Sequence, residues 1–267
     1  MQIKTIHHDL GIDTEAVSIV PLSDLHLGAE FNPEPFYKYR EWILAEPNRY
    51  CVLNGDILDM AIKSSIGDVY TSMRPKEQID LAVRMLQPLA AENRILAYLD
   101  GNHEYRVTKE VDIHPGEHIC ALLGIPRLYD ANGCVLFLSV GHNRKKAGTS
   151  GNHKKVNRMT YTIFMLHGSR GGRRIGGKAN ALEDMQSVCV CDCYIVAHTH
   201  QKMVFSKKII IPEGRNKTLK YKEQTFVNCG SFLDYAEYAI RKGYPPGVTG
   251  TPIIELDGTR HEVRARV

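Results

Sequence analysis

Short runs of apolar residues, rich in Val, Ile and Leu, recur along this chain, and each run ends in a cluster of polar residues. Runs that lack polar alternation are typical of strands covered on both faces. We predict five strands from these runs. The following ranges include the polar cluster at the end of each run: 16–26, 50–56, 94–104, 161–168 and 193–200. The polar residues therefore fall where the predicted strands end.

Helical patterns separate the early strands. Segment 33–46 opens with prolines, which suit a first helical turn. Segment 75–93 carries apolar residues at helical spacing, and its Pro88 is expected to kink the helix or start a new turn. A short helix is predicted over 116–124. Alternation of strand and helix predicts an α/β fold, in which ligands bind beyond the carboxyl ends of the strands.

The second half of the chain has a different character. Segment 134–141 is a predicted strand, and 142–158 and 170–178 are predicted to be basic, Gly-containing loops. Short strands and turns are expected over 201–267, which makes a second sheet plausible. Because no linker, low-complexity tract or repeat is visible, we predict a single domain over residues 1–267.

Composition places few limits on function. The 267 residues are 43% hydrophobic and 24% charged, as is ordinary for soluble globular proteins. A net charge of +4 favours anionic partners only weakly. The first residues show no signal-peptide pattern, and no apolar run approaches the roughly 20 residues that a membrane span needs. We therefore expect a cytoplasmic protein with no membrane partner, whose oligomeric state is left open.

Seven cysteines are present, and none forms a CxxC pair. The one cluster, "CVCDC", contains Cys189, Cys191 and Cys193, and its spacing fits neither the usual zinc pattern nor a common iron–sulfur run. We interpret these residues as buried or half-buried free thiols in a reducing compartment. Metal contact or redox chemistry is the alternative.

The polar clusters at the strand ends combine carboxylates, an amide and imidazoles. A strand places residues i and i+2 on one side, so His198 and His200 are predicted to point toward one region. Carboxylates and imidazoles gathered at this density need counter-charges, and divalent cations supply them. Together these ligand types suit zinc, manganese, iron or nickel. The candidates are Asp24, His26, Asp56, Asp59, Asn102, His103, Glu104, His167, His198 and His200.

The order "DLH", "GDILD", "GNHE", "H" and "HTH", between residues 24 and 200, resembles the calcineurin-like metallophosphoesterase superfamily. The resemblance implies a four-layer α/β/β/α sandwich, in which two packed mixed sheets are flanked by helices. It also implies that strands within 201–267 complete the second sheet. No single motif is specific, but five in this order, each at the end of a predicted strand, form a strong signal.

A pair of divalent cations follows from the same resemblance, with Mn²⁺ favoured and Fe, Zn or Ni as alternatives. Two ions about 3.5–4 Å apart lower the pKa of a shared water and hold phosphorus in line with the resulting hydroxide. His103 is implied as an outer-sphere residue near the leaving group, and Asp59 as a support for a metal ligand. The implied ligands are Asp24, His26 and His200 for one ion, Asn102, His167 and His198 for the other, and Asp56 as the bridge between them.

Departures from the patterns of individual branches narrow the substrate. Met60 and Ala61 follow Asp59 where protein Ser/Thr phosphatases carry arginine and glycine, and His103 stands where the lipid-A pathway pyrophosphatases carry arginine. "SDLHLG" with "GNHE" resembles bacterial and phage-type phosphodiesterases and DNA-repair nucleases. We therefore predict a phosphodiesterase or phosphomonoesterase acting on nucleotides or nucleic acid. The alternative is a nucleic-acid-binding or regulatory protein on the same scaffold with little turnover.

Basic residues follow His167 closely and are candidates for substrate binding. Arginine holds phosphate in a forked geometry, so Arg170, Arg173 and Arg174 are predicted to contact the substrate. A solvated, flexible loop is the alternative. The remaining histidines show no ligand spacing and are assigned to the surface or the core: His7, His8, His114, His118, His142, His153 and His261.

Overall fold

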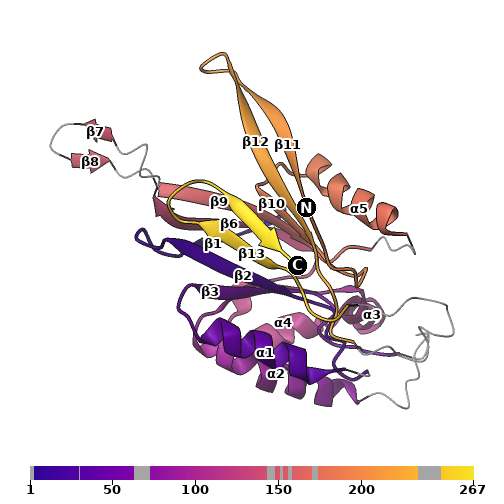
Figure 1. Ribbon diagram of the computed structural model, residues 1–267. Coiled ribbons are helices and arrows are strands. Elements are labelled where there is room, and N and C mark those ends of the chain that lie inside the picture. The colour runs from indigo at the N-terminus through magenta and orange to yellow at the C-terminus, as the bar shows by residue number, and fades with distance from the viewer. Residues whose placement is uncertain are drawn as a thin grey trace.

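Two six-stranded sheets packed face to face form the centre of the protein (Figure 1). The computed structural model describes residues 3–29, 31–62, 73–142, 148–150, 153–155, 158–169, 174–233 and 248–267. Sheet A contains, in spatial order, β1 (Lys4–Asp9), β6 (Gly133–His142), β9 (Arg158–Leu166), β10 (Cys193–Val196), β12 (Thr218–Asn228) and β11 (Met203–Glu213). Sheet B contains, in spatial order, β14 (Val263–Arg266), β13 (Ile253–Asp257), β2 (Ala16–Leu22), β3 (Arg49–Asn54), β4 (Ile95–Leu99) and β5 (Tyr129–Asp130).

The main core lies between the two sheets. Alternate residues of a strand point to one face, and in β6 the inward positions are Cys134, Leu136, Leu138 and Val140, all fully buried. Residues of β2, β3, β4, β9 and β13 complete the same cluster from both sheets. Strands that are covered on both faces explain the apolar runs in the sequence.

Helices cover the outer faces of both sheets. On sheet B lie α1 (Pro33–Leu44), α2 (Pro75–Ala91) and α4 (Pro115–Leu122), whose buried residues pack in one cluster with β2, β3 and β4. On sheet A, α5 (Ile175–Glu183) contributes Leu182 to a cluster with residues of β6, β9, β10 and β12. The four-layer α/β/β/α arrangement of two mixed sheets is therefore confirmed.

Several details differ from the sequence-based expectations. The C-terminal strands do not all complete one sheet: β11 and β12 join sheet A, whereas β13 pairs antiparallel with β2 and β14 extends sheet B beyond it. Pairing with β13 satisfies the backbone groups of β2 on the side away from β3. Pro88 neither ends α2 nor starts a new helix, because the helix continues to Ala91. The helix α3 (Asn102–Val111), which the sequence pattern did not predict, directly follows β4.

The two predicted basic loops also differ. Within 142–158, β7 (Gly148–Ser150) and β8 (His153–Lys155) form a two-stranded antiparallel ribbon. Residues 175–178 of the second predicted loop are the first turn of α5, because Arg174 is the residue that precedes the helix. No helix among the described residues is long and apolar enough to cross a membrane.

We predict that Ile163→Ala lowers the free energy of unfolding by about 2–5 kcal/mol, because Ile163 is fully buried between the sheets. Urea denaturation followed by circular dichroism measures this value. The matched control is Ile210→Ala, since Ile210 is 54% exposed, and its effect should stay within about 0.5 kcal/mol. Equal effects of the two substitutions would contradict the assignment of this core.

Candidate metal centre

Two sets of strand ends meet at one edge of the sandwich. The parallel strands β2, β3 and β4 of sheet B lead into Asp24, Asp56 and Asn102. The parallel strands β9 and β10 of sheet A lead into His167 and into the pair His198 and His200. Carboxyl ends of parallel strands share one edge, so each sheet brings its own polar residues together. The packing of the sheets then places the acidic residues of sheet B against the histidines of sheet A.

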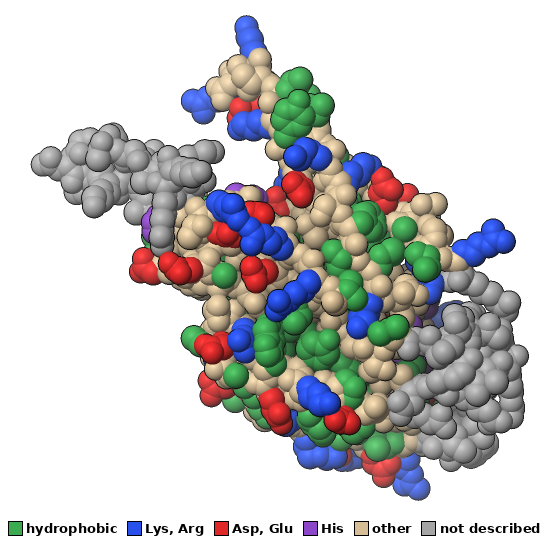
Figure 2. Space-filling view, viewed as in Figure 1, with side chains coloured by type: hydrophobic (Ala, Val, Ile, Leu, Met, Phe, Trp, Pro, Cys, Tyr) green, Lys and Arg blue, Asp and Glu red, His purple; other side chains and the backbone are tan. Residues whose placement is uncertain are grey.

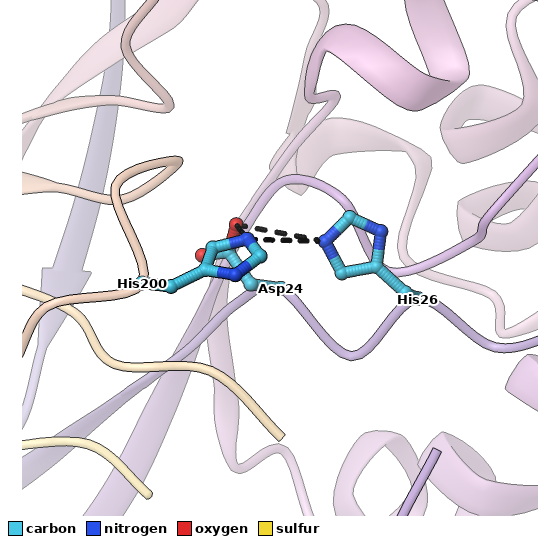
Figure 3. Close-up of side chains that lie close together, drawn as sticks. All are labelled: Asp24, His26 and His200. Atoms are coloured by element: carbon cyan, nitrogen blue, oxygen red, sulfur yellow. Dashed lines mark hydrogen bonds and ion pairs between the residues drawn. The ribbon is translucent and has the colours of Figure 1, made fainter. Parts of the chain in front are cut away.

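The first group consists of Asp24, His26 and His200, whose ligand atoms lie close together (Figure 3). His200 Nε2 is 3.1 Å from Asp24 Oδ1 and 3.4 Å from His26 Nε2. His26 Nε2 is 3.9 Å from the same carboxylate oxygen. Asp24 and His26 are buried, whereas the side chain of His200 is 29% exposed. This group is therefore open to solvent on the side of His200.

The second group consists of Asp56, Asn102, His167 and His198. Asn102 Oδ1 is 2.7 Å from His198 Nδ1 and 3.2 Å from His167 Nε2. His167 Nε2 is also 3.2 Å from Asp56 Oδ2. The other ring nitrogen of His167 donates to the backbone carbonyl of Asn54 at 2.8 Å, which fixes the direction of the ring.

Asp56 lies between the two groups. Its Oδ2 is 3.2 Å from His167 Nε2 in the second group and 3.8 Å from His26 Nε2 in the first. Its Oδ1 accepts a hydrogen bond from the backbone N–H of His103 at 2.8 Å. The other six predicted ligands therefore lie in the two groups on either side of the Asp56 carboxylate, the position expected of a bridge.

His103 and Asp59 lie beside the first group. The Nδ1–H of His103 donates to the backbone carbonyl of Asp59 at 2.7 Å, and Asp59 Oδ1 is 3.3 Å from the same nitrogen. Asp59 Oδ1 is also 4.0 Å from His26 Nδ1, so this carboxylate contacts both rings. On the other side of the His103 ring, Nε2 accepts a hydrogen bond from Arg106 at 2.8 Å. Arg106 thus reaches the site.

The two central carboxylates are held ionised by their neighbours. Burial alone would raise the pKa of Asp24, but His200, His26 and His167 outweigh burial and hold it well below its usual value. Burial also opposes the ionisation of Asp56, and His167, His26 and His103 lower its pKa despite this. Both side chains therefore carry negative charge at neutral pH.

The imidazoles divide into two kinds. Burial disfavours the charged form of His167, but Asp56 and Asp24 outweigh it and raise the pKa of this ring to about 10. Burial lowers the pKa of His26, with a further contribution from His103, and burial together with His167 lowers the pKa of His198. His26 and His198 therefore present neutral rings with a free lone pair, the form that binds metal ions.

Five of these seven residues have left-handed backbone conformations, with φ of 51° at Asp24, 48° at His26, 50° at Asp56, 67° at His198 and 53° at His200. This conformation costs a non-glycine residue roughly 1–2 kcal/mol. Such residues concentrate at functional sites, where the surrounding structure holds them in place. The loops thus adopt a costly backbone that turns the side chains toward one region.

Glu104, one of the candidates from the sequence, holds these loops together. It is fully buried. Its Oε2 accepts hydrogen bonds from the N–H groups of Asp56 at 3.0 Å and Gly101 at 2.9 Å, and its Oε1 accepts one from Leu58 at 2.8 Å. The bond from Gly101 N–H to Glu104 is the half of a capping box that the glutamate supplies, but glycine has no side chain to complete the box, so the sequence signal is weak.

Gly101 has a second role beside Asp56. A Cβ atom at this position would lie 2.1 Å from Asp56 Oδ1, so only glycine leaves room for the carboxylate. The turn after β4 therefore needs glycine at this position so that the Asp56 carboxylate can pack against it.

The predicted substrate-binding residues are placed only in part. Arg170 and Arg173 lie outside the described residues. Arg174 is exposed at the start of α5, and no contact joins it to the metal-ligand candidates in the described part of the chain. Lys178 of α5 donates to the carbonyl of Thr199 at 3.0 Å, so this helix is tied to the loop that carries His198 and His200.

The remaining sequence candidates lie away from this site. Cys191 and Cys193 are buried and Cys189 is half-buried, all as free thiols, as expected for the cluster, whereas the reducing compartment stays a prediction. No cysteine joins a possible metal-binding group among the described residues. The other histidines whose side chains are described also belong to no such group: His7, His8, His114, His118, His142 and His261.

Comparison with known proteins gives similarity only at the level of structure. No protein-family model matches the chain, and no curated protein sequence does so. Vacuolar Protein Sorting 29 from Cryptosporidium parvum is 16% identical, with a TM-score of 0.46 and coverage of 95% of this chain and 98% of that one. The phosphoesterase Yfce from E. coli is 16% identical, with a TM-score of 0.40 and coverage of 90% and 88%. A predicted phosphoesterase from Streptococcus pneumoniae is 13% identical, with a TM-score of 0.39 and coverage of 94% and 88%.

The chain is similar to solved phosphoesterase structures.

We predict that Glu104→Gln lowers the free energy of unfolding by about 1–3 kcal/mol, because an amide cannot accept from all three backbone N–H groups and leaves buried donors unpaired. Urea denaturation measures the change. Glu110→Gln, on an exposed position of the same helix, is the control and should have little effect. A Glu104→Gln protein as stable as the Glu110→Gln protein would contradict this role of Glu104.

Proposed function

We propose that this protein is a calcineurin-like metallophosphoesterase that hydrolyses phosphoester bonds of nucleotides or nucleic acid. One observation carries the proposal: two groups of metal-ligand side chains, drawn from both sheets, lie on either side of the Asp56 carboxylate. Each motif of the sequence resemblance contributes at least one of these side chains. The assignment of the residues to two ions is part of the proposal.

Divalent cations fit the residues that are present. Asp24 Oδ1 is buried, and its near neighbours are the ring nitrogens of His200 at 3.1 Å and His26 at 3.9 Å, the two residues that would share an ion with it. The mixture of carboxylate, amide and imidazole suits Mn²⁺, our favoured ion, as well as iron, zinc and nickel. Asp24, His26 and His200 would hold one ion, Asn102, His167 and His198 the other, and Asp56 both. When bound, the pair would supply an activated water near neutral pH and neutralise charge on the phosphoryl group.

His103 is proposed to protonate the leaving oxygen. Its Nδ1–H is held by Asp59, which leaves Nε2 on the side facing Asp56, 3.9 Å from Oδ2. Burial opposes a charge on the ring, but Asp59 and Asp56 outweigh it and raise the pKa of His103, which favours a protonated ring near neutral pH. The side chain is 17% exposed, so a substrate can reach it.

Arg106 is proposed to bind a phosphoryl oxygen. Its hydrogen bond to His103 Nε2 requires an unprotonated nitrogen there, whereas the acidic neighbours favour a proton at this atom. A phosphate group resolves the conflict, because a guanidinium that turns toward phosphate oxygens leaves Nε2 able to carry its proton. The two residues would then act on different oxygens of the substrate. Arg170, Arg173 and Arg174 remain proposed contacts for the rest of the substrate.

Hydrolysis of bis-(p-nitrophenyl) phosphate with added manganese tests the proposal. The wild-type protein should be active, and Asp56→Asn should abolish activity because both ions lose a ligand. Asp13→Asn, on an exposed position, is the matched control and should be fully active. A wild-type protein that binds metal but hydrolyses neither this diester nor p-nitrophenyl phosphate with manganese, zinc, iron or nickel would favour the binding-protein alternative.

We predict that His103→Ala lowers kcat by about a hundredfold or more for a substrate with a poor leaving group, because general acid catalysis contributes about 10²–10⁴-fold. The loss should be much smaller with p-nitrophenolate, which departs without a proton. His118→Ala, an exposed histidine, serves as the control. Equal losses on both substrates would argue that His103 acts on binding and not on the leaving group.

We predict that metal affinity rises with pH between about 7 and 10. The pKa of His167 near 10 means that its ring is protonated in the metal-free protein at neutral pH, so a cation must displace that proton. Calorimetric titration in buffers of different ionisation enthalpy should show release of about one proton per protein at pH 7. Affinity that stays constant over this pH range would contradict the assignment of His167 as a ligand.

A further inference from the structure

A long two-stranded ribbon projects from the body of the protein (Figure 1). β11 and β12 pair from Met203 with Asn228 to Glu213 with Thr218. On the other side of β12, β10 pairs only with Thr225–Asn228. The ribbon beyond Thr225 is therefore two strands wide, and we name residues 207–223 the arm.

The two faces of the arm differ. On one face, Lys207 pairs with Glu183 of α5 at 2.5 Å and Lys222 pairs with Asp192 at 2.9 Å, so this face is joined to the body. Nearer the sandwich, the opposite face includes Val227, which is buried between the two sheets. Farther out, that face lies beyond the second sheet, and its residues are exposed. We name this opposite side the free face.

The free face combines apolar, aromatic and basic side chains. Cross-strand pairs place Ile210 beside Tyr221 and Lys208 beside Glu223, and alternate pairs share a face. Ile210 is 54% exposed, Leu219 62% and Tyr221 70%. Figure 2 shows apolar and basic side chains together on this projection. A tyrosine this exposed is available to stack on a planar ligand.

The arm carries a net positive charge. Six of the 34 Lys and Arg residues and only two of the 30 Asp and Glu residues lie within 203–228, so the formal charges of the rest of the chain balance. Lys207, Lys220 and Lys222 form ion pairs, whereas Lys208, Arg215 and Lys217 form none with the described residues. Three cations thus remain for an anionic partner, on the free face and at the turn.

We infer that the arm binds single-stranded nucleic acid, and that the substrate is a polynucleotide that extends from the arm to the metal centre. This inference rests on the proposed function and names its substrate class. Lys208, Arg215 and Lys217 bind phosphates, and Tyr221 stacks on a base, the two contacts that sequence-tolerant single-strand binding uses. A protein partner would explain the apolar residues but not the concentration of positive charge.

The base of the arm is connected to the metal centre. Asn228, the last residue of β12, donates to the side chain of Thr199 at 2.8 Å, and Thr199 lies between His198 and His200. Tyr221 is seven residues before Asn228, which is about 24 Å along a strand. This separation corresponds to about seven nucleotides at the spacing of one stacked strand. Because Thr225 and Val227 on the same face are buried, a bound strand cannot follow β12 itself, and a substrate that reaches both places must be longer than this direct separation.

Fluorescence anisotropy with a fluorescein-labelled single-stranded oligonucleotide, in EDTA so that cleavage does not interfere, tests the charges. The double variant Lys208→Glu with Arg215→Glu should bind about tenfold more weakly, and its plot of log affinity against log salt should be less steep by about two, because two phosphate contacts are lost. Arg84→Glu with Arg127→Glu changes the total charge equally at exposed positions outside the arm and should bind as the wild type does. DNA and RNA oligonucleotides are tested side by side.

Tyr221→Ala tests stacking in the same assay and should weaken binding about tenfold, whereas Tyr221→Phe, which keeps the ring, should bind as the wild type does. If Tyr221→Ala leaves binding unchanged but alters the sedimentation of the protein, the free face is a protein interface and the inference is wrong. Unchanged binding by the double variant Lys208→Glu with Arg215→Glu, the arm charge variant, would also overturn the inference.

Hydrolysis separates this inference from the proposed function. The arm charge variant should hydrolyse bis-(p-nitrophenyl) phosphate and dinucleotides at the wild-type rate, but its KM for long oligonucleotides should rise about tenfold. An active protein whose KM for long oligonucleotides is unaffected by the arm substitutions would refute the role of the arm and leave the proposed function intact. A wild-type protein inactive on every phosphoester with every metal would refute the proposed function, and with it the claim that the bound polynucleotide is a substrate.

Discussion

The rest of the structure depends on the burial of two carboxylates. This burial requires positive or polarisable groups around them. Asp24 and Asp56 have practically no contact with solvent. A buried carboxylate without compensation is strongly unfavourable, so partners must come from elsewhere in the fold. Sheet B carries both acidic residues, but its own edge does not supply enough of these partners. Sheet A supplies His167, His198 and His200 from the other side, so the centre exists only where the sheets pack.

Support for this arrangement comes from the backbone as much as from the side chains. The left-handed conformations at Asp24, Asp56 and His200 are costly for residues with a Cβ atom. Glu104 offsets part of this cost because its carboxylate accepts from N–H groups of both the loop after β3 and the turn after β4. A residue that touches no proposed ligand atom thus fixes where Asp56 points.

The sequence predicted the architecture well, and the residues that it proposed for the site lie together in the structure, for a common reason. Apolar runs covered on both faces are visible without a structure, and their polar ends must meet where parallel strands end. The resemblance then linked residues as distant as Asp24 and His200. The helix α3 was missed because its first residues, Asn102 and His103, serve the site and obscure the helical pattern. The environment of Glu104 was undecidable, because a Glu in a first helical turn can face solvent or neighbouring loops equally well.

The arm shows a second limit of sequence analysis. Its strands are eleven residues long, but the lysines among the isoleucines suggested short strands and turns. Which lysines stay unpaired depends on Glu183 and Asp192, whose positions relative to the ribbon follow only from the packed fold. The charge count of the sequence therefore indicated a weak preference for anionic partners, but not where on the protein they would bind.

The division of the centre between the sheets has a consequence for biosynthesis. Residues up to Glu104 leave the ribosome first, carrying both central acids, while His167, His198 and His200 of sheet A are still unmade. Until roughly residue 200 has emerged, a nascent sheet B cannot enclose Asp24 and Asp56 without burying uncompensated charge, so its edge must stay hydrated or be held by a chaperone. Closure of the sandwich and completion of the cation cage are, on this view, a single late event in the life of the chain.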